Sequence, residues 1–461
     1  MKKNKILYYI SIASSVILLF IFTAVTAAWL TNNALTGGAG IAKKFRQEII
    51  DASRFPSLAR DAIINLKIFN ITVNTTLLIP KKEVEKSTWT RKFPAAEDSG
   101  YLLLSGVDRK SGMSSVSLIQ IADGTIIHKW EPDWLSIIKK TTYTKNSIAG
   151  IHPSEMRAFH PLLLNDGTLI FNTGGALVSM GICNQKTNWI LNEIAHHSVE
   201  VDNNGDIWTI SYENKSFPQN YYLNDRVKED AIAKIDKNGN LISRFSFAKI
   251  LIENGYTSLF MGVNWSEFQK DPIHLNQISI ASESGKYWAK GDLLISARHL
   301  STVFLYRPSS RKIIWSKTGP WMGQHSVTFL GNHRISVFDN NVYAGAPKEQ
   351  PFINSDDNNR FIIYDFETKK TYQPYEKLLQ RERPVTITEG RGQVLEDGGL
   401  FIEETNQGRH LRFSKDKLIW SRVNDYDEDY IGTVSWSRYL SLNEVTESIN
   451  SINKSKSNCV R

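Results

Sequence analysis

Histidine is the residue type in this sequence best suited to chemistry near neutral pH, because an imidazole can attack as a nucleophile, transfer a proton or bind a metal. All ten histidines lie between His128 and His410. Three settings are informative: His196-His197-Ser198, Asp271-Pro272-Ile273-His274-Leu275-Asn276 and Gly323-Gln324-His325-Ser326. A lone histidine is more often structural than catalytic. Their importance therefore depends on whether the fold brings them together.

The elements that must position them are short strands joined by tight turns. From about residue 97 the chain consists of runs rich in Val, Ile, Tyr, Phe and Trp, separated by Asp, Asn and Gly. A strand-turn-strand pattern recurs as IADGTII (121–127), LLNDGTLIF (163–171), VDNNGDIW (201–208), IDKNGNLI (235–242) and VLEDGGLF (394–401). The glycine supplies the positive φ that a tight hairpin requires. A second element recurs as KIIWSK (312–317) and KLIWSR (417–422).

This recurrence predicts an all-β fold, a six-bladed β-propeller. Repeats spaced by about 40 to 60 residues over roughly 330 residues suit about six four-stranded blades. An array of β-sandwiches would give similar hairpins and is the alternative fold. Propellers bind and react at the mouth of the central channel, where strands from every blade converge. Histidines that are scattered along the sequence could therefore meet there.

The N-terminus predicts export. Lys2, Lys3 and Lys5 precede a stretch without charged residues, Ile6 to Leu30. A stretch of this length can span a bilayer, whereas the apolar part of a signal peptide is about 7 to 15 residues long. We therefore expect residues 1–30 to be a transmembrane anchor rather than a cleaved signal peptide, which the small residues Val25-Thr26-Ala27 would also permit. The three lysines predict a cytoplasmic N-terminus and an exported body.

The rest of the chain divides into three parts. Residues 31–95 predict a helical or extended connecting region, with an amphipathic helix over 41–66 that is interrupted at Pro56. Residues 96–446 are the predicted propeller, and 447–461 a polar, loose tail. Cys183 and Cys459 are the only cysteines, so disulfides cannot be the main source of stability. We expect Cys183 to be a small buried apolar residue.

Composition excludes several classes of protein. The 461 residues are 41% hydrophobic and 22% charged, which excludes disorder, collagen and coiled coil as descriptions of the whole chain. The net charge of +8 is dilute, and no run of five like charges occurs. Nucleic acid is therefore not an expected partner.

Four separated motifs resemble those of one known family. The motifs are AHHSVEVDNNGDIW (195–208), DPIHLNQISI (271–280), GDLLISARHLSTVFLYRPSSRKIIWSKTGP (291–320) and WMGQHSVTFLGNHRISVFDNN (321–341). In order and context they are similar to the paired-histidine, His-x-Asn, Ser-x-Arg and Gln-His elements of the bacterial arylsulfotransferases. In that family a six-bladed propeller transfers sulfate through a histidine. The likeness covers roughly residues 150–345 and is weaker toward the C-terminus.

The resemblance implies a role for each matching residue. His325 falls on the nucleophile, with His197, His274 and Arg298 around the transferred group. The positions of Asn276, Ser296 and Gln324 imply substrate contacts. The implied reaction moves a sulfuryl group from an aryl sulfate ester to a phenolic acceptor, by a ping-pong route through a sulfohistidine, without metal, cofactor or nucleotide. Arg298 would stabilise the charged oxygens, and either His197 or His274 would act as general acid.

Combined with the predicted anchor, the resemblance implies a single-pass protein of the bacterial inner membrane. Its N-terminus would be cytoplasmic and its propeller periplasmic. The implied partners are the small-molecule donor and acceptor, together with the membrane through the N-terminal helix.

The sequence departs from the family pattern beside two of the histidines. Ser198 and Ser326 stand where many members have Asp, which removes a carboxylate that could orient each ring. We choose His197 over His196, and exclude His299 beside Arg298, because neighbouring residues of a strand face opposite sides. The remaining histidines are expected to be structural or on the surface; they are His128, His152, His160, His333 and His410.

Two other classes of function remain open. RPSSRKIIWSK (307–317) resembles the blades of quinoproteins, which makes a non-catalytic or quinone-binding propeller the main alternative, although the acidic and Thr-Gly-Lys positions of those blades are replaced here. A metal-dependent hydrolase would use His197, His274 and His325 as ligands. Arg298 beside them would repel a cation, so we expect no metal.

Overall fold

The structure is a computed structural model of the whole chain. It describes residues 77–87, 89–141, 153–183, 187–192, 195–213, 229–261, 271–342 and 358–456. The chain divides into two compact units, 1–74 and 75–461, and every described residue belongs to the second. The predicted anchor (1–30) and most of the predicted connecting region lie outside the described residues. Among the helices that are described, none is long and apolar enough to cross a membrane.

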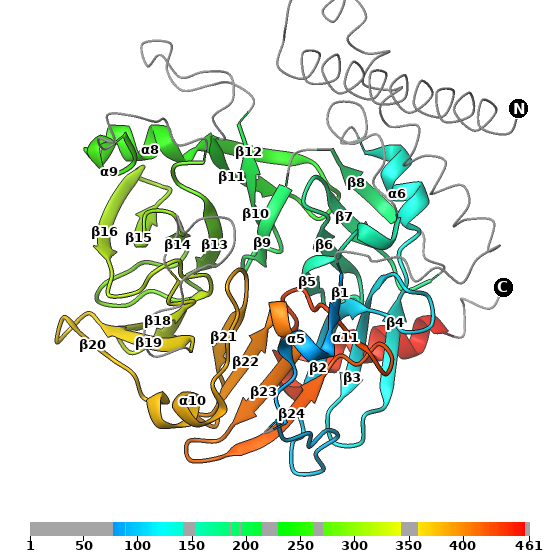
Figure 1. Cartoon of the computed structure of the whole chain (residues 1–461). Helices are drawn as coiled ribbons and strands as arrows, with labels where there is room; N and C mark the ends of the chain where they lie inside the picture. Colours follow the sequence, from blue (N-terminus) through cyan, green and yellow to red (C-terminus); the bar gives the residue numbers. More distant parts are fainter. Residues whose placement is uncertain are drawn as a thin grey trace, which may run out of the picture. The chain divides into compact units, whose positions relative to one another are not determined.

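The second unit is a six-bladed β-propeller, as the sequence predicts (Figure 1). Each blade is a four-stranded antiparallel sheet. The first three blades, written from the innermost strand outward, are β26 (Arg438–Leu440), β2 (Tyr101–Val107), β3 (Ser114–Gln120), β4 (Ile126–Trp130); β5 (Phe159–Leu163), β6 (Leu169–Asn172), β7 (Leu177–Met180), β8 (Thr187–Leu191); and β9 (Ala195–Val201), β10 (Ile207–Tyr212), β11 (Asp230–Ile235), β12 (Leu241–Ser246).

The fourth to sixth blades repeat this order from the channel outward. They are β13 (Leu275–Ile280), β14 (Leu293–Ala297), β15 (Thr302–Arg307), β16 (Lys312–Thr318); β17 (Val327–Gly331), β18 (Arg334–Asp339), β19 (Arg360–Asp365), β20 (Lys370–Tyr372); and β21 (Arg391–Val394), β22 (Leu400–Glu404), β23 (Arg409–Phe413), β24 (Leu418–Val423). Every blade thus presents one innermost strand to the centre of the ring.

The ring is closed by strands from both ends of the propeller sequence. The innermost strand of the first blade, β26, comes from the C-terminal part, and it pairs with β2 through Tyr101 and Leu440. A second tie joins β1 (Leu78–Pro80) to β25 (Tyr430–Gly432). The propeller unit therefore begins earlier than the predicted boundary at residue 96.

The recurring turns are the hairpins that the sequence predicts. Gly124, Gly167, Gly205, Gly239 and Gly398 have φ of 77, 82, 84, 86 and 76°. They join β3 to β4, β5 to β6, β9 to β10, β11 to β12 and β21 to β22. The KIIWSK and KLIWSR elements lie in the outermost strands β16 and β24.

The core lies between the blades. Strand β2 is buried at every position, because blades cover both faces of its sheet. Ile210 and Ile232 of the third blade share one apolar cluster with Ile278 and Phe304 of the fourth. This stacking of sheets holds the innermost strands in fixed positions around the channel.

Short helices connect or flank the strands. Asp133 caps α6 by accepting a hydrogen bond from the backbone N–H of Ser136, and Ser246 caps α8 by accepting one from Lys249. The short helices are α5 (Lys81–Val84), α6 (Trp134–Lys140), η1 (Pro153–Glu155), α8 (Phe247–Glu253), α9 (Thr257–Met261), α10 (Glu376–Glu382) and η2 (Thr405–Gln407).

The C-terminal segment differs from the predicted loose tail. Residues Leu442–Lys456 form the helix α11, the longest helix that the structure describes. Val445 and Ile452 are fully buried in the cluster between the first and second blades. The segment is polar in composition, so its sequence does not predict a packed helix. Its two buried residues lie on one face of the helix, seven positions apart.

Cys183 also differs from its prediction. It is half-buried and disulfide-bonded rather than a buried apolar residue. Its Sγ lies 4.0 Å from the backbone carbonyl oxygen of Ser455 near the end of α11. The disulfide is therefore formed beside the point where the C-terminal helix ends.

We expect Ile452→Ala to lower the free energy of unfolding by about 2–5 kcal/mol, because it removes a fully buried side chain from an apolar cluster. Urea unfolding measures the loss. The matched control is Ile449→Ala on the same helix, where the side chain is only partly buried and a smaller loss is expected. Equal losses would show that α11 is not anchored through Ile452.

Candidate active site

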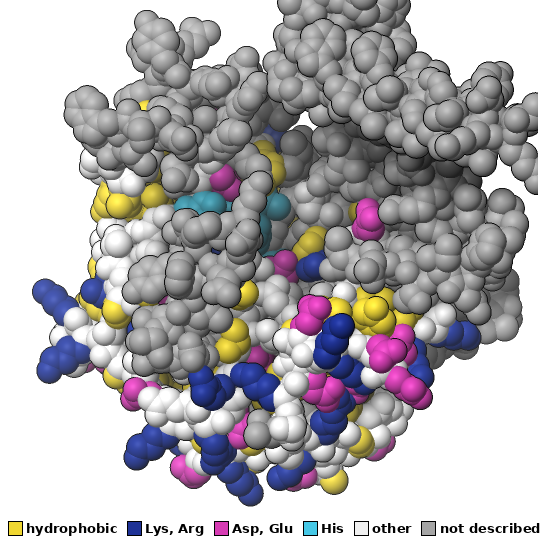
Figure 2. All heavy atoms as spheres, in the orientation of Figure 1, with side chains coloured by type: hydrophobic (Ala, Val, Ile, Leu, Met, Phe, Trp, Pro, Cys, Tyr) yellow, Lys and Arg dark blue, Asp and Glu magenta, His cyan; other side chains and the backbone are white. Residues whose placement is uncertain are grey.

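The innermost strands begin with residues in an unusual backbone conformation. His160, His197, His274, Glu389 and Trp436 have φ of 51, 55, 53, 60 and 61°, in the left-handed region that residues other than glycine rarely adopt. They lie within or just before β5, β9, β13, β21 and β26. Figure 2 shows histidine side chains gathered in the hollow at the middle of this face. The left-handed residues interrupt the alternation of side chains at the channel mouth.

The structure brings together the three histidines that the sequence singled out. The ring centroids of His197 and His274 are 5.1 Å apart, and those of His197 and His325 are 6.4 Å apart. They come from the third, fourth and fifth blades. Three neighbouring blades thus supply one imidazole each.

His325 is held in a single tautomer. Its Nδ1 lies 2.7 Å from Oδ1 of Asn340 and 3.2 Å from the backbone carbonyl oxygen of Gly323, both of which are acceptors. Nδ1 therefore carries the proton. The other nitrogen, Nε2, accepts a hydrogen bond of 3.0 Å from the backbone N–H of Glu389. The lone pair on Nε2 is the nucleophilic position of this ring.

The electrostatic surroundings keep His325 neutral. Burial, followed by the positive charge of Arg298, holds its pKa well below the ordinary value of 6.5. Its side chain is only 1% exposed. A neutral imidazole is the form that can attack, so the ring is in its reactive state at neutral pH.

Asn340 is a site residue that the sequence reasoning missed. Besides accepting from His325, it donates from Nδ2 to the backbone carbonyl oxygens of Thr386 and Glu389, at 3.0 and 2.8 Å. It thereby fixes both the ring and the segment whose N–H faces the ring. Asn340 lies in the motif VFDNN, but nothing in its local sequence marks it as the partner of a histidine 15 residues earlier.

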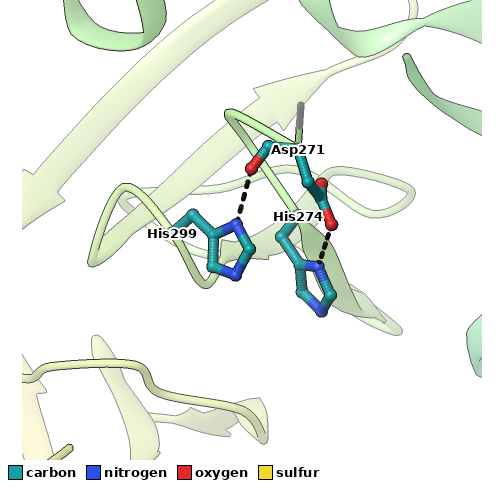
Figure 3. Close-up of side chains that lie close together, drawn as sticks. All are labelled: Asp271, His274 and His299. Carbon is teal, nitrogen blue, oxygen red and sulfur yellow. Dashed lines mark hydrogen bonds and ion pairs between the residues drawn. The ribbon is translucent and has the colours of Figure 1, made fainter. Parts of the chain in front are cut away.

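Asp271 orients His274. Oδ2 of Asp271 lies 2.7 Å from Nδ1 of His274, so the carboxylate accepts a hydrogen bond from Nδ1–H and fixes the orientation of the ring (Figure 3). The spacing Asp-x-x-His in DPIHLN was a signal that could have identified this pair.

His196 belongs to the site, which corrects its exclusion. Its Nδ1 lies 2.7 Å from Nδ1 of His197, and its Nε2 lies 3.3 Å from Oδ1 of Asp230. The alternation rule fails here because His197 is left-handed and the pairing of β9 with β10 shifts register beside it. Burial, then the neighbouring His196 and His274, lower the pKa of His197 well below 6.5, so His197 stays neutral.

Arg298 and His299 lie just beyond the end of β14, where strand alternation no longer applies. Nη1 of Arg298 lies 2.9 Å from Nε2 of His299, which corrects the exclusion of that histidine. Nε of Arg298 is buried without a hydrogen-bond partner among the described residues. Burial lowers the pKa of Arg298, which still leaves the guanidinium charged at neutral pH.

Asn276, Ser296 and Gln324 are fully buried beside these residues. Asn276 donates from Nδ2 to the backbone carbonyl oxygen of Gln324 at 2.7 Å. Gln324 in turn donates from Nε2 to Oγ of Ser296 and to the carbonyl oxygen of Ala297, both at 3.1 Å. These bonds tie the fourth blade to the segment that carries His325. Direct contact of the three residues with substrate stays a prediction.

The serines beside the histidines do not deprive the site of orienting groups. Oγ of Ser198 donates to the carbonyl oxygen of Ile278, and Ser326 donates to that of Gly392, so both hydroxyls tie neighbouring blades together. The orienting contacts come from elsewhere: Asn340 for His325 and the neighbouring His196 for His197.

His160, which the sequence predicts to be structural or on the surface, is buried beside the histidines of the site. Its ring is 3.7 Å from that of Trp436 and 6.1 Å from that of His197, measured between centroids. Burial, followed by the charge of Arg438, lowers its pKa well below 6.5. Among the other histidines that were expected to be structural, His410 is buried, and its Nε2 forms a hydrogen bond with Oγ of Ser437. His152 lies outside the described residues.

Three buried neutral histidines at the channel mouth make stability depend on pH: His160, His197 and His325. Their pKa values in the folded protein lie below 6.5. The unfolded chain therefore takes up protons that the folded chain does not as the pH falls below about 6.5, and the free energy of unfolding decreases. Each such histidine adds a slope of up to about 1.4 kcal/mol per pH unit below that pH.

We expect His160→Asn to make this slope shallower by up to about 1.4 kcal/mol per pH unit below pH 6.5, because one histidine no longer titrates. Asparagine tolerates the left-handed backbone at this position. Urea unfolding of both proteins between about pH 5 and 8 measures how the free energy of unfolding depends on pH. Above about pH 7.5 the two curves of free energy against pH should run parallel. Parallel lines below pH 6.5 as well would contradict the assignment of a neutral buried His160.

A family model described as arylsulfotransferase (ASST) matches residues 160–425, which include all the histidines of the site and Arg298. No curated protein matches the chain. One similar solved structure is a protein of unknown function from Bacteroides caccae, 13% identical, with a TM-score of 0.45, covering 74% of this chain and 99% of that chain.

Two further structures show lower similarity. Virginiamycin B lyase from Staphylococcus aureus is 10% identical, with a TM-score of 0.31, and 62% of this chain and 69% of that chain are covered. The β-propeller domain of Cps50 (Swd1) from Myceliophteria thermophila is 8% identical, with a TM-score of 0.39, and 76% and 89% are covered.

Proposed function

The chain belongs to the arylsulfotransferase family, and from this premise we propose that it moves a sulfuryl group from an aryl sulfate ester to a phenolic acceptor through a sulfohistidine at His325. One observation carries the proposal. His325 is buried and neutral, Asn340 fixes its proton on Nδ1, and its ring lies together with those of His197 and His274 and near the charge of Arg298.

In the first half-reaction Nε2 of His325 attacks the sulfur of the donor. The N–S bond forms as the bond from sulfur to the phenolic oxygen breaks, and the phenolate leaves with the electron pair. The ring then carries the sulfuryl group on Nε2 and keeps its proton on Nδ1, where Asn340 accepts it. The positive charge of the sulfated ring is thus met by a carbonyl oxygen.

His274 is the group best suited to protonate the leaving phenolate. The carboxylate of Asp271 fixes the Nδ1–H of His274 and so leaves Nε2 of this ring to exchange a proton with the phenol, whereas burial and neighbouring rings keep His197 neutral. Proton transfer from His274 gives a neutral phenol and a neutral His274. The same ring can then accept the proton of the incoming phenol in the second half-reaction.

The remaining groups stabilise the three sulfuryl oxygens, which carry the negative charge in the transition state. Arg298 supplies a guanidinium whose Nε has no partner among the described residues. His197 supplies an N–H at Nε2 when its Nδ1 accepts from His196. The backbone N–H of Glu389 donates a hydrogen bond to Nε2 of His325. Once Nε2 carries the sulfuryl group, this N–H can donate to a sulfuryl oxygen instead.

We propose further that the propeller works outside the cytoplasm, attached to the bacterial inner membrane by residues 1–30. Three lysines ahead of an uncharged stretch of 25 residues support this location. The disulfide at Cys183 adds support, because disulfides persist in oxidising compartments such as the periplasm. Labelling of single introduced cysteines from either side of the membrane tests the orientation.

The proposed reaction is tested on the purified full chain with a chromogenic aryl sulfate and a phenol. We expect the protein to gain about 80 Da on incubation with the donor alone and to lose this mass when the phenol is added. Coupled formation of the aryl sulfate of the acceptor completes the test. Transfer without an adduct would contradict the ping-pong route, and no transfer with a range of donors would contradict the sulfotransferase.

A further inference from the structure

Asp271 contacts two histidines through two different groups (Figure 3). Its carboxylate bonds to His274, as described above. Its backbone carbonyl oxygen lies 2.6 Å from Nδ1 of His299. The two imidazole rings lie nearly parallel, with centroids 4.4 Å apart and planes inclined by 29°. One residue of the loop before β13 thus holds both rings.

The contact with the carbonyl determines the tautomer of His299. A carbonyl oxygen can only accept, so Nδ1 of His299 must donate to it. The other nitrogen, Nε2, lies 2.9 Å from Nη1 of Arg298, and a guanidinium can only donate. The ring is therefore neutral, with its proton on Nδ1 and its lone pair on Nε2 directed to Arg298.

The backbone fixes the two segments to each other. The N–H of Arg298 donates to the carbonyl oxygen of His274 at 2.9 Å, and the N–H of His299 donates to that of Ile273 at 3.2 Å. Arg298 has one side-chain partner that the structure describes, His299. The long, flexible side chain of the arginine would otherwise lose its rotamer freedom only when substrate binds.

We infer that His299 is a positioning residue, which takes its proton orientation from the backbone of Asp271 and holds the guanidinium of Arg298 ready for the sulfuryl oxygens. This inference rests on the proposed function for its kinetic consequence. The geometry itself also makes Asp271 the common support of the proposed general acid and of the proposed anion-binding arginine. Because Nε2 of His299 already accepts a hydrogen bond from Arg298, the arginine side chain loses less conformational entropy when the transition state forms.

A cation at Asp271, His274 and His299 is the competing explanation of the same cluster. One ligand atom from each residue lies close enough to the others to hold a metal ion. However, a cation bound at Nε2 of His299 would displace Arg298 and meet its positive charge. The arrangement therefore favours the arginine over a metal.

Two substitutions of His299 separate its two bonds. Gln can place its carbonyl oxygen near the position of Nε2 and accept from Arg298, whereas Asn can place its N–H near Nδ1 and keep only the bond to Asp271. We expect His299→Asn to lower the rate of adduct formation by about 10- to 100-fold, and His299→Gln to recover most of that loss. Because the His299 side chain is exposed, neither change removes core packing.

A double-mutant cycle with Arg298→Ala tests whether His299 acts through the arginine. In the Arg298→Ala background we expect His299→Asn to change the remaining rate by less than about twofold. A full 10- to 100-fold further loss in that background would overturn the inference, because His299 would then act independently of Arg298.

A measurement without turnover separates this inference from the proposed reaction. ¹⁵N NMR of histidine-labelled protein, assigned with His299→Asn, should show His299 protonated on Nδ1 and not on Nε2, and the Nε2 resonance should shift in Arg298→Ala. A ring protonated on Nε2 would overturn the inference, whether or not sulfate is transferred. Stoichiometric zinc that shifts the His274 and His299 resonances together would overturn it as well.

Discussion

Replacing His325 with alanine should abolish sulfuryl transfer, with a loss on the order of 10⁴-fold or more and no covalent adduct. The reason is that the variant lacks the imidazole proposed to attack: Asn340 fixes the proton of His325 on Nδ1, and Nε2 can attack once it exchanges the hydrogen bond from the Glu389 N–H for the sulfur of the donor. Intact mass after incubation with the donor and initial rates with the phenol measure the two parts of this expectation.

The matched control for this variant is His333→Ala. His333 also has a left-handed backbone, but it lies in the hairpin between β17 and β18, where it contacts Asp365. We expect this control to keep the wild-type rate. An adduct of undiminished yield in His325→Ala would show that another residue carries the sulfuryl group, and peptide mapping of the adduct would identify it.

The second large effect is expected for His274→Ala, and it depends on the leaving group. Loss of a general acid costs about 10²- to 10⁴-fold when the leaving group is basic. We therefore expect a loss of that size with phenyl sulfate, whose phenolate needs a proton. With 4-nitrophenyl sulfate, whose phenolate is a good leaving group, the loss should be less than about tenfold.

Initial rates with a series of substituted phenyl sulfates measure this dependence. The slope of log rate against the pKa of the leaving phenol should become steeper in His274→Ala than in the wild type. The control is His197→Ala. In our assignment His197 is a neutral residue that donates a hydrogen bond to a sulfuryl oxygen, so its loss should lower the transfer rate by a similar factor with every phenyl sulfate. Equal slopes for His274→Ala and the wild type would contradict its role as general acid.

The fold was predictable because it is encoded locally. A glycine at a positive φ between two apolar runs specifies a hairpin, and Gly124, Gly167 and Gly205 each form one. Repetition of the pattern then indicates the number of blades. The closure of the ring was not predictable, since β26 has only three residues and pairs with a strand more than 300 positions earlier.

The site was predictable only where sequence motifs carry it. His197, His274, His325 and Arg298 lie in motifs and meet as expected. Asp271 and Asn340 lie in the same motifs, but only Asp271 stands at a spacing that marks it as a histidine partner. Glu389 lies outside the motifs and reaches His325 across 64 positions, because the geometry of the ring and not local sequence places the sixth blade beside the fifth. His196 was misassigned because alternation along a strand fails at a left-handed residue.

The closing strand has a consequence for the timing of activity during synthesis. Trp436, which lies just before β26, packs its ring on His160 at the channel mouth. The same segment that completes the first blade therefore also completes the wall of the site, and it is among the last parts of the chain to leave the ribosome. A growing chain that still lacks β26 therefore lacks one strand of the first blade and the Trp436 wall of the channel mouth. We expect the site to be complete only after this strand has been made and has paired with β2.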